Sequence, residues 1–534
     1  MKVHQIPFDK TNIYSELITD YLNESKDLVS SISSFPNFQS LTNLSNSKSN
    51  QFSQKNRDNL IKHFKEQYFD INISKNVKKN IELLSKNNTV TITTGHQLSL
   101  MTGPLYFIYK IVSIIKLSAL LNKKNKNKNH VPVFWMATED HDFEEIKSFH
   151  FNDKNIIWDQ PKSGAVGEIS LENLECLKLF IEDELGVSKT SNFIKHTIEE
   201  TYLSKKNLSD ATFHLVNILF SEYGLLVLDA NSIKLKKSMI PFFEKELQNH
   251  ECKKQVDLQT ENLKGTYGKK FKPQVNPREI NLFYISNGNR SRILKSKKGY
   301  ELSDSDKTFT KDSILKELRK YPDRFSPNVL MRPLYQEVIL PNIAYIGGAG
   351  EISYWLQLKG FFESQNITFP ALIVRNSALL ISSKISKKMN KYNINYIDLF
   401  NDKNSFIKKK ISEISNINID LQFLKDKLES QFKYLEKIAK KTDSTFEGAI
   451  KAQKSKQFKG IDKLEKRLLK AQKRKYIGHL EQMELIYDNL FPENILQERK
   501  KNFFDLYMKF GYNFIPDLIK NFNPLNKEFT VFKF

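Results

Sequence analysis

The sequence predicts an α/β protein: a Rossmann-like parallel-sheet core with inserted connecting segments and a protruding antiparallel α-helical coiled coil. Two observations predict the core. From Thr89 onward, strand-like apolar runs alternate with helical patterns, and clusters of polar residues follow the predicted strands. A third predicts the coiled coil, because the chain beyond Ser382 is rich in Lys, Glu, Gln and Leu and has few Gly or Pro residues. The predicted units are a core (1–382, with an insertion at about 150–210), a helical coiled-coil domain (383–490) and a C-terminal segment that returns to the core (491–534).

Composition narrows the class of protein. A chain of 534 residues, 40% of them hydrophobic, is long enough for roughly two to four packed units. The net charge of +22 could indicate a nucleic-acid partner. The basic residues, however, are mostly Lys scattered along the chain, and few are Arg residues interleaved with aromatic ones, so we expect no nucleic-acid partner. Cys176 and Cys252 lie far apart without a CxxC motif, which predicts neither disulfides nor a structural metal. The start is unlike a signal peptide and no apolar run approaches the roughly 18 residues of a membrane span, so we expect a cytoplasmic protein with no membrane contact.

The core elements follow in chain order. The β-branched run 89–94 predicts a strand, and Pro104 suits the first position of an apolar helix that continues to Leu121. The continuous apolar run 131–137 predicts a strand buried on both faces, and two such strands joined by a helix form a right-handed βαβ unit. Residues 224–229 and 371–375 predict further buried strands.

The coiled coil is predicted from apolar spacing. The expected seam consists of Leu421, Leu424, Leu428, Leu435 and Ile438, then Ile461, Leu464, Leu468 and Ala471 after a turn at 442–444. These spacings of three, four and seven residues favour an antiparallel helical hairpin used for packing or dimerisation.

The first polar cluster follows the first strand. Gly95, His96 and Gln97 lie just before Gly103, with Tyr106 and Lys110 on the next helix, so all should gather where backbone N–H groups favour an anion. No GxGxxG or Walker sequence is present, and a capping turn with an exposed His is the alternative.

The second cluster follows the second strand. Residues 138–145 combine five carboxylates with His141, and HExxH or Cys/His zinc spacing is absent. One interpretation is a helix N-terminus capped by Thr138. The other makes His141 a general base, with Asp140 and Asp142 beside it as catalytic acids and Glu139 or Asp140 binding an ammonium group or Mg²⁺.

The third cluster predicts another wall of the same cleft. It comprises Arg332, Gln336, Gly347, Gly348, Gly350, Glu351, Tyr354 and Trp355. The glycines allow close approach of the backbone to a ligand, and the acid and aromatics would share one helix face. Arg278, Arg290 and Arg292 could add anion contacts.

Together these clusters resemble the bacillithiol biosynthesis cysteine-adding enzyme family, the cysteine ligases of the last step of that thiol pathway. The matching segments run from Thr94 to Lys110, from Val131 to Glu145, from Arg332 to Glu337, from Tyr345 to Glu351 and from Leu496 to Arg499. His96 departs from the pattern, since the family often has Gln there. The resemblance implies a fold comparable with class I aminoacyl-tRNA synthetases, a coiled coil used in dimerisation, and L-cysteine and glucosaminyl malate as substrates.

The resemblance also implies ATP as cosubstrate, with Mg²⁺, because a carboxylate does not acylate an amine in water without activation. We expect Asp140 and Glu139 to hold the cysteine ammonium or metal, His141 to act as base, and Arg332 to bind the malate carboxylates. The anionic partner would lie against 95–97 and Lys110. Two alternatives stay open: a tRNA-linked aminoacyl or nucleotidyl transferase, although a KMSKS-like loop is lacking, and a coiled-coil scaffold with a vestigial cleft.

Overall fold

The core of the computed structural model is a five-stranded parallel sheet. The structure describes residues 2–159, 164–286, 288–415, 417, 420–442 and 444–534. The strands, in spatial order, are β13 (Ala371–Val374), β12 (Asn342–Gly347), β2 (Thr89–His96), β3 (Asn129–Met136) and β6 (Leu226–Asp229). The predicted Rossmann-like parallel sheet is therefore confirmed, with all four predicted strands in it.

The strand order creates a topological switch point. The chain passes from β2 outward through β3 to β6, and then returns to the other side of β2 for β12 and β13. The carboxyl ends of β2 and β12 therefore border a crevice, since the connections leave these neighbours in opposite directions. Both ends carry residues that were predicted to bind a ligand, namely His96 and Gly347.

The connection from β2 to β3 is α5 (Tyr106–Lys124), whose side chains are buried over most of its length. It packs on β2, β3 and β12, as expected of an apolar crossover helix. The helix begins later than predicted, because Pro104 forms a β-bridge with Asn502 of the C-terminal segment. That long-range pairing cannot be read from the local sequence.

The N-terminal region also contributes a helix to the sheet. The stretch from Thr42 to Ser53 resembles a surface loop in sequence, but it lies largely in α2 (Phe38–Gln51). The Asn37 side chain accepts from Ser40 N–H and caps this helix, and Leu41 is buried where α2 packs near β2 and β12. Capping and burial thus outweigh the low helix propensity of its Ser and Asn residues.

The insertions form separate layers around the sheet. The first contains β4 (Ser148–Phe151), β5 (Lys154–Ile157), α6 (Glu175–Asp183), α7 (Lys189–Glu200) and α8 (Leu208–Phe220). The second contains α9 (Ile233–Lys236), α10 (Ile240–Asn249), α11 (Glu251–Tyr267), α12 (Lys311–Lys320) and an antiparallel sheet in the order β10-β9-β8-β7-β11. Its strands are β7 (Leu282–Ser286), β8 (Asn289–Ser296), β9 (Gly299–Leu302), β10 (Ser305–Phe309) and β11 (Phe325–Pro327). Sequence patterns did not predict this second sheet.

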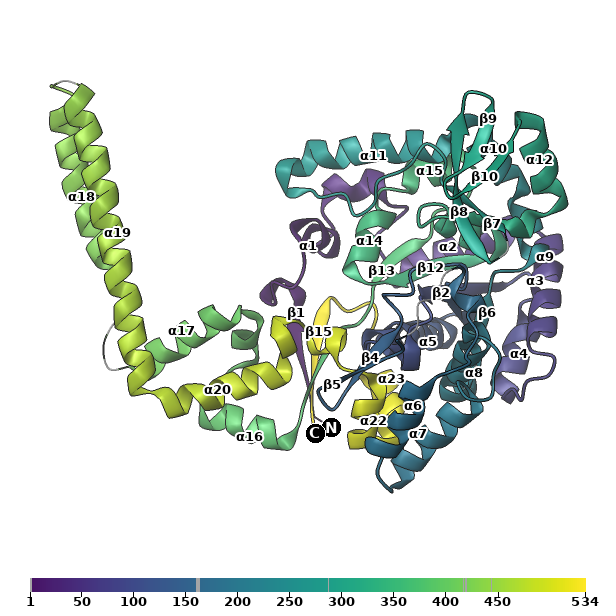
Figure 1. The fold of residues 1–534 in the computed structure, drawn as a ribbon, viewed down its shortest axis with the longest axis horizontal. Helices are drawn as coiled ribbons and strands as arrows, with labels where there is room; N and C mark the ends of the chain where they lie inside the picture. The colour runs from purple at the N-terminus through teal and green to yellow at the C-terminus, as the bar shows by residue number, and fades with distance from the viewer. Residues whose placement is uncertain (1, 160–163, 287, 416, 418–419, 443) are drawn as a thin grey trace.

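The two ends of the chain meet in a third sheet. Strand β15 (Glu528–Lys533) lies between β1 (Lys2–Pro7) and β14 (Ala378–Ile381), so the termini lie side by side (Figure 1). The C-terminal helices α22 (Phe503–Phe510) and α23 (Phe514–Asn521) add aromatic side chains to the main core. The C-terminal segment is thereby anchored against the same sheet that carries the polar clusters.

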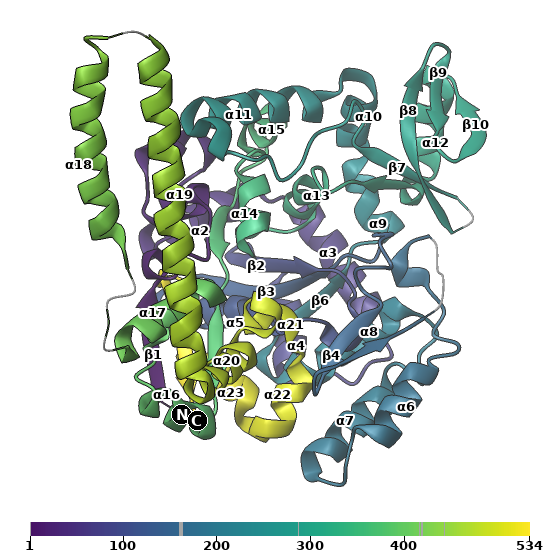
Figure 2. The ribbon, with the colours of Figure 1, turned by 60° about the vertical axis from the view of Figure 1, so that its left-hand side comes forward.

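A long helical arm leaves the core. Helices α18 (Gln422–Ala439) and α19 (Ser444–Lys475) lie side by side and project beyond the other elements (Figures 1 and 2). Helices α16 (Ser383–Lys391), α17 (Lys403–Ile414) and α20 (Ile477–Leu490) form its base. This confirms the predicted coiled coil but not the whole of the expected seam. Leu424, Leu435, Ile438 and Leu464 are exposed, whereas Phe432, Ala439 and Ile450 form the buried cluster of the hairpin, with Leu428 packed against it. Residue 443 of the expected turn lies outside the described residues. No helix in the described parts of the chain has the length and apolar character needed to cross a membrane.

Candidate active site

Two adjoining hollows lie at the switch point. The larger, of about 360 Å³, is lined by Gly95, His96, Gln97, Trp135, Ala137, Glu145, Val329, Arg332, Pro333, Gln336, Tyr345, Glu351, Tyr354 and Trp355. The smaller, of about 290 Å³, is lined by His96, Gln97, Tyr106, Lys110, Gly348, Ala349, Gly350, Glu351, Arg375 and Arg499. Since three residues are common to both, the hollows form one cleft with two halves.

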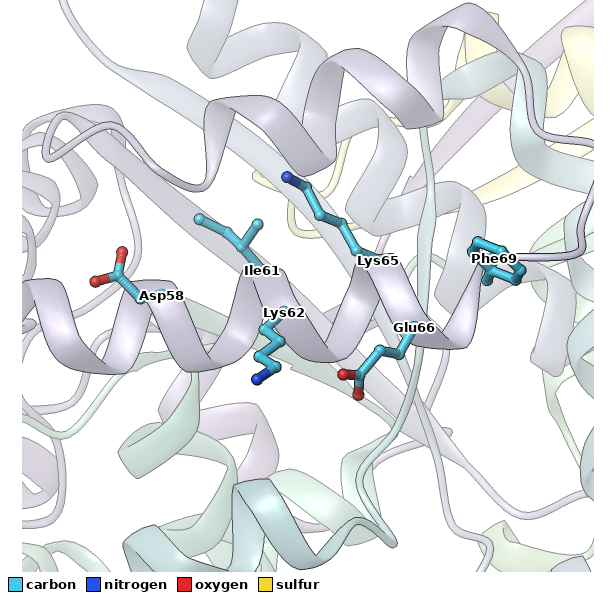
Figure 3. Close-up of a pocket in the computed structure, with 6 residues that line it drawn as sticks. All are labelled: Asp58, Ile61, Lys62, Lys65, Glu66 and Phe69. Atoms are coloured by element: carbon cyan, nitrogen blue, oxygen red, sulfur yellow. The ribbon is translucent and has the colours of Figure 1, made fainter.

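Another hollow, on the surface of one helix, is not lined by residues from distant segments. Six residues of α3 (Gln54–Gln67) and the turn after it line a surface depression of about 700 Å³ (Figure 3). Their side chains point to different sides of the helix, and Phe69 is 83% exposed. The cleft at the strand ends, where distant segments face one another, is therefore the better candidate site.

His96 is positioned at the boundary between the two halves. Its Nδ1 lies 2.9 Å from the Gln97 carbonyl, to which it must donate, so the neutral ring keeps the lone pair on Nε2. Burial, with the nearby Lys110 charge, lowers the pKa of His96 to about 4. The ring packs against Tyr106 and Phe107. His96 is therefore a neutral hydrogen-bonding group near pH 7.

Lys110 and Glu351 form an ion pair between the halves. Their charged atoms lie 2.8 Å apart, and Glu351 also accepts from Tyr345 O–H and Gly348 N–H, both at 2.7 Å. Burial would raise the pKa of Glu351, but the Lys110 charge and these hydrogen bonds lower it below its ordinary value. Gly347 is needed here, since a methyl group on it would lie 2.8 Å from the Tyr345 ring. The pair thus fixes the turn that begins α14 (Ala349–Trp355).

The acidic segment after β3 is a turn and not the start of a helix. Asp140 accepts from Gln97 Nε2 at 3.3 Å and lies 3.7 Å from Nη1 of Arg332, the first residue of α13 (Arg332–Ile339). Burial would raise the pKa of Asp140, but its contact with His141 and the charges of Arg332 and Arg290 lower it well below its ordinary value. Asp140 is therefore a carboxylate that holds two cleft residues in place.

Glu139 has a different partner from the one predicted. It forms an ion pair with Lys236, whose side chain is fully buried and also donates to Asn231 and to the Asp323 carbonyl. A cysteine ammonium or Mg²⁺ would have to displace this lysine. Among the described residues, no group of three or more His, Cys, Asp or Glu side chains could hold a metal. Glu139 is therefore occupied by Lys236, and the expected Mg²⁺ contact of Glu139 or Asp140 stays a prediction.

His141 lies outside the lining of both halves and is half exposed. Arg290 donates to its Nδ1 at 2.8 Å while stacking on Phe283 at 3.8 Å. Since Nδ1 accepts this bond, the neutral ring carries its proton on Nε2, which leaves no free lone pair for base catalysis. A base role for His141 would require Arg290 to move.

The predicted residues divide into those that line the cleft and those that do not. The cleft is lined by Gly95, His96, Gln97, Tyr106, Lys110, Arg332, Gln336, Gly348, Glu351 and Tyr354. Three others do not line it: Gly347 packs against Tyr345 and Glu351, the carbonyl of Gly103 accepts from Asn502, and Asp142 is exposed. The first and third predicted clusters therefore form the cleft, and the second supports it.

Comparison with known proteins supplies the family. Residues 1–376 match the family model described as "Bacillithiol biosynthesis BshC, N-terminal Rossmann-like domain", and residues 378–534 match the C-terminal coiled-coil domain of BshC. This chain belongs to the BshC family. The resemblance stated from sequence is confirmed.

Several curated BshC relatives match this chain over nearly its full length. Three of them bear the name "Putative cysteine ligase BshC". That of Flavobacterium johnsoniae is 45% identical over 98% of each chain, and that of Christiangramia forsetii is 43% identical over 100% of this chain and 99% of its own. That of Cytophaga hutchinsonii is 35% identical over 94% of this chain and 93% of its own.

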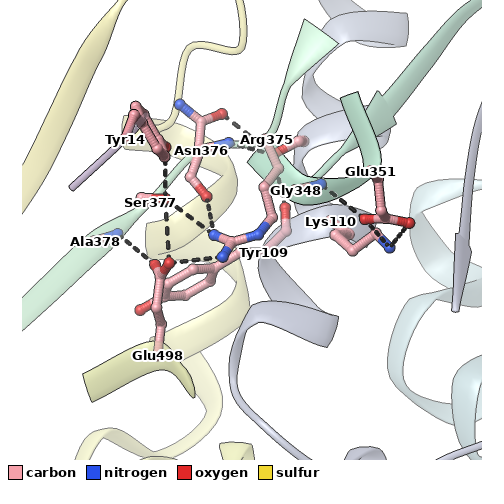
Figure 4. Close-up of polar contacts among 11 residues, drawn as sticks. Tyr14, Tyr109, Lys110, Gly348, Glu351, Arg375, Asn376, Ser377, Ala378 and Glu498 are labelled. Atoms are coloured by element: carbon pink, nitrogen blue, oxygen red, sulfur yellow. Dashed lines mark hydrogen bonds and ion pairs between the residues drawn. The ribbon is translucent and has the colours of Figure 1, made fainter. Parts of the chain in front are cut away.

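Sequence reasoning missed two arginines of this BshC-family cleft. Arg375 follows β13, and Arg499 lies in the short helix α21 (Gln497–Lys500). Glu498 accepts from Arg375 Nη2 at 2.7 Å and from Ala378 N–H at 3.0 Å, so the C-terminal segment holds this arginine against the cleft (Figure 4). A charged residue directly after a buried apolar strand was the available signal.

Proposed function

We propose that this protein is a cytoplasmic cysteine ligase that adds L-cysteine to glucosaminyl malate in the last step of bacillithiol biosynthesis. The observation that carries the proposal is the two-part cleft at the switch point of a BshC-family core. The name of the relatives, cysteine ligase, supports cysteine as one substrate, and the family resemblance implies glucosaminyl malate as the other. A cleft with two joined halves suits a reaction that unites two molecules.

The chemistry requires activation of a carboxylate. In the proposed reaction, the cysteine carboxylate attacks a phosphorus atom of ATP, forming an acyl phosphate and ADP or an acyl adenylate and pyrophosphate. The sugar amine then attacks the acyl carbon, releasing phosphate or AMP, and loses a proton. Since no group of three or more His, Cys, Asp or Glu side chains among the described residues could hold a metal, we propose that Mg²⁺ enters bound to the nucleotide.

Residues of the larger half have distinct proposed roles. Arg332 binds a malate carboxylate, and Asp140 keeps Arg332 and Gln97 oriented toward the cleft. His96 accepts a hydrogen bond from an uncharged donor through Nε2, because its ring is neutral. We retain His141 as a second candidate for proton transfer, dependent on movement of Arg290.

We further propose that the coiled-coil arm joins two copies of the protein. Several apolar side chains of the arm remain exposed in a single chain, among them Phe423, Leu424, Tyr434, Leu435 and Leu464. Burial of such a stripe against a second copy would remove apolar surface from water. Light scattering should give twice the chain mass, and Leu435→Lys should shift the protein toward the monomer.

The direct test is a complete reaction mixture. The purified protein is incubated with cysteine, glucosaminyl malate and Mg-ATP, and the conjugate is sought by mass spectrometry. Omitting each component in turn identifies the cosubstrate, and detection of AMP or ADP identifies the activated intermediate. Conjugate formation only in the complete mixture supports the proposal.

A matched pair of variants links the activity to the cleft. Arg332→Gln should raise KM for glucosaminyl malate by about tenfold to a hundredfold, the value of a lost charged hydrogen bond. Arg319→Gln removes the same charge from an exposed arginine that pairs with Glu244, and should leave KM unchanged. Transfer of cysteine to tRNA in place of the sugar would favour an aminoacyl transferase, and failure to bind cysteine or nucleotide would favour a scaffold.

A further inference from the structure

The smaller half of the cleft contains an unused cationic donor. Arg375 is 5% exposed, and its Nε has no hydrogen-bond partner among the described residues. We propose that Arg375 and Arg499 form a binding site for a small oxyanion, a carboxylate or phosphate group. This inference deepens the proposed function and rests on it for the natural ligand, although anion binding can be measured without turnover.

The other guanidinium nitrogens of Arg375 already have partners. Its Nη1 donates to the Asn376 carbonyl and Ser377 Oγ, both at 3.0 Å, and its Nη2 donates to Glu498. The Nε edge faces the opposite way, toward Gly348, where a methyl group on that glycine would lie 3.9 Å from Nε (Figure 4). A buried donor without a partner is costly, which favours an acceptor supplied by a ligand.

Arg499 supplies the second cationic group. It is exposed, it lines the same hollow, and no ion pair joins it to a residue within the described ranges. The next residue, Lys500, pairs instead with Glu493 at 2.7 Å. The planar guanidinium of Arg499 is thus free to bind an oxyanion through two N–H groups.

The charge of this half also favours an anion. Lys110, Arg375 and Arg499 are cationic, whereas Glu351 and Glu498 neutralise the first two. Arg499 is left without a counter-charge, and His96 adds none because it is neutral near pH 7. This half of the cleft therefore carries one unbalanced positive charge, which a bound carboxylate or phosphate would neutralise.

The volume limits the ligand. About 290 Å³ lies at the lower end of the roughly 300–1,000 Å³ that drug-sized ligands occupy. A dicarboxylic acid or the phosphate end of a larger molecule suits this space better than a complete nucleotide. The shared chemistry is an oxyanion, and its source is either the malate carboxylate that Arg332 does not bind or a phosphoryl group.

The test is isothermal titration calorimetry of the full-length protein with L-malate and, separately, with inorganic phosphate. The exposed position of Arg499 makes Arg499→Gln the safest variant for folding. Arg375→Lys keeps the charge next to Glu498 but removes the Nε donor. Lys500→Gln is the matched control, because it removes an adjacent charge that does not line the hollow. Circular dichroism establishes that each variant is folded.

We expect the wild type to bind at least one anion, and both cleft variants to weaken that binding by about tenfold, as for one lost charge-assisted contact. Lys500→Gln should stay within about twofold. Binding of malate alone identifies the malate group as the source, and binding of phosphate alone identifies a phosphoryl group. No binding of either anion at millimolar concentration, or wild-type binding by Arg499→Gln, overturns the proposal.

These outcomes are separable from those of the proposed function. Anion binding that depends on Arg499, together with no conjugate formation, would leave the site standing and reject the ligase reaction. Conjugate formation with unchanged KM values in Arg499→Gln would support the ligase reaction and reject the oxyanion site.

Discussion

The carboxyl end of β2 and the turn after β3 are neighbours in space but serve different purposes. Residues 95–97, of which the first two end β2, have a single ionisable side chain, that of His96, which lines both halves of the cleft. The turn at 138–142 is rich in charged side chains, yet none of its five residues lines either half of the cleft. Two of them instead form ion pairs with residues around the cleft. Glu139 pairs with Lys236, Asp140 with Gln97 and Arg332, and Thr138 donates to Asp229 at 2.6 Å.

The difference teaches that local charge density indicates ion pairs more directly than it indicates a ligand site. Charges taken out of water beside a sheet need partners, and Glu139 and Asp140 find theirs on α9 and α13. Residues 95–97, which carry less charge, are left free to face the cleft.

The largest effect should come from Glu139→Gln. It leaves the fully buried Lys236 ammonium without its carboxylate, which should cost about 3–5 kcal/mol in free energy of unfolding. Chemical denaturation measures this loss. Glu144→Gln, at an exposed acid that pairs with Lys147 on the surface, should change stability by less than about 1 kcal/mol. Equal stability of the two variants would show that Glu139 is not a structural partner.

Asp140→Asn should have the next largest effect, and on activity. Loss of the carboxylate weakens the hold on Arg332 and Gln97, so kcat/KM for conjugate formation should fall by about tenfold to a hundredfold. If Asp140 only positions Arg332, then combining Asp140→Asn with Arg332→Gln should add little to the loss from Arg332→Gln alone. Full additivity would contradict the positioning role.

His96→Gln should reduce the acid sensitivity of the fold. The folded-state pKa of His96 is about 4, below its ordinary value of 6.5, so the unfolded chain binds more protons between these values. The stabilisation is complete above pH 6.5 and is lost as the pH falls toward 4. Removing His96 should therefore shrink the stability difference between pH 7 and pH 4 by about 2 kcal/mol.

Denaturation curves at several pH values measure the effect of His96→Gln. His196→Gln, which replaces an exposed histidine beside Glu200, serves as the surface control. A variant at His96 with the same pH dependence as the wild type would mean that this ring is not held neutral by burial.

The smallest effect should come from Asp142→Asn. Asp142 is exposed and lines neither half of the cleft, so the rate of conjugate formation should stay within about twofold of the wild type. Glu145→Gln is the matched comparison, since Glu145 is also exposed but lines the larger half, and we expect a several-fold loss there. A larger loss for Asp142→Asn than for Glu145→Gln would restore the catalytic interpretation of the acidic turn.

Much of the fold could be predicted from sequence because its signals are local. The apolar runs of β2 and β3 identify strands buried on both faces, and the leucine spacing of 421–438 identifies the arm. The sheet β7–β11 could not be predicted in this way. Its strand β8 mixes exposed and buried residues without a clear period over 289–296, and the pairing of β7 with β11 joins residues 282–284 to residues 325–327, far apart in the chain.

The sequence by itself determined four strands of the parallel sheet, the helical arm, the family and the positions where polar residues follow strands, since each depends on neighbours within a few residues. Only the tertiary structure decided which charges are satisfied by the protein. The partners of Glu139, His141 and Arg375 are 97, 149 and 123 residues away in the chain. Burial makes an unpaired charge costly, so the completed fold selects these pairs and leaves Arg499 and the Nε of Arg375 facing the cleft.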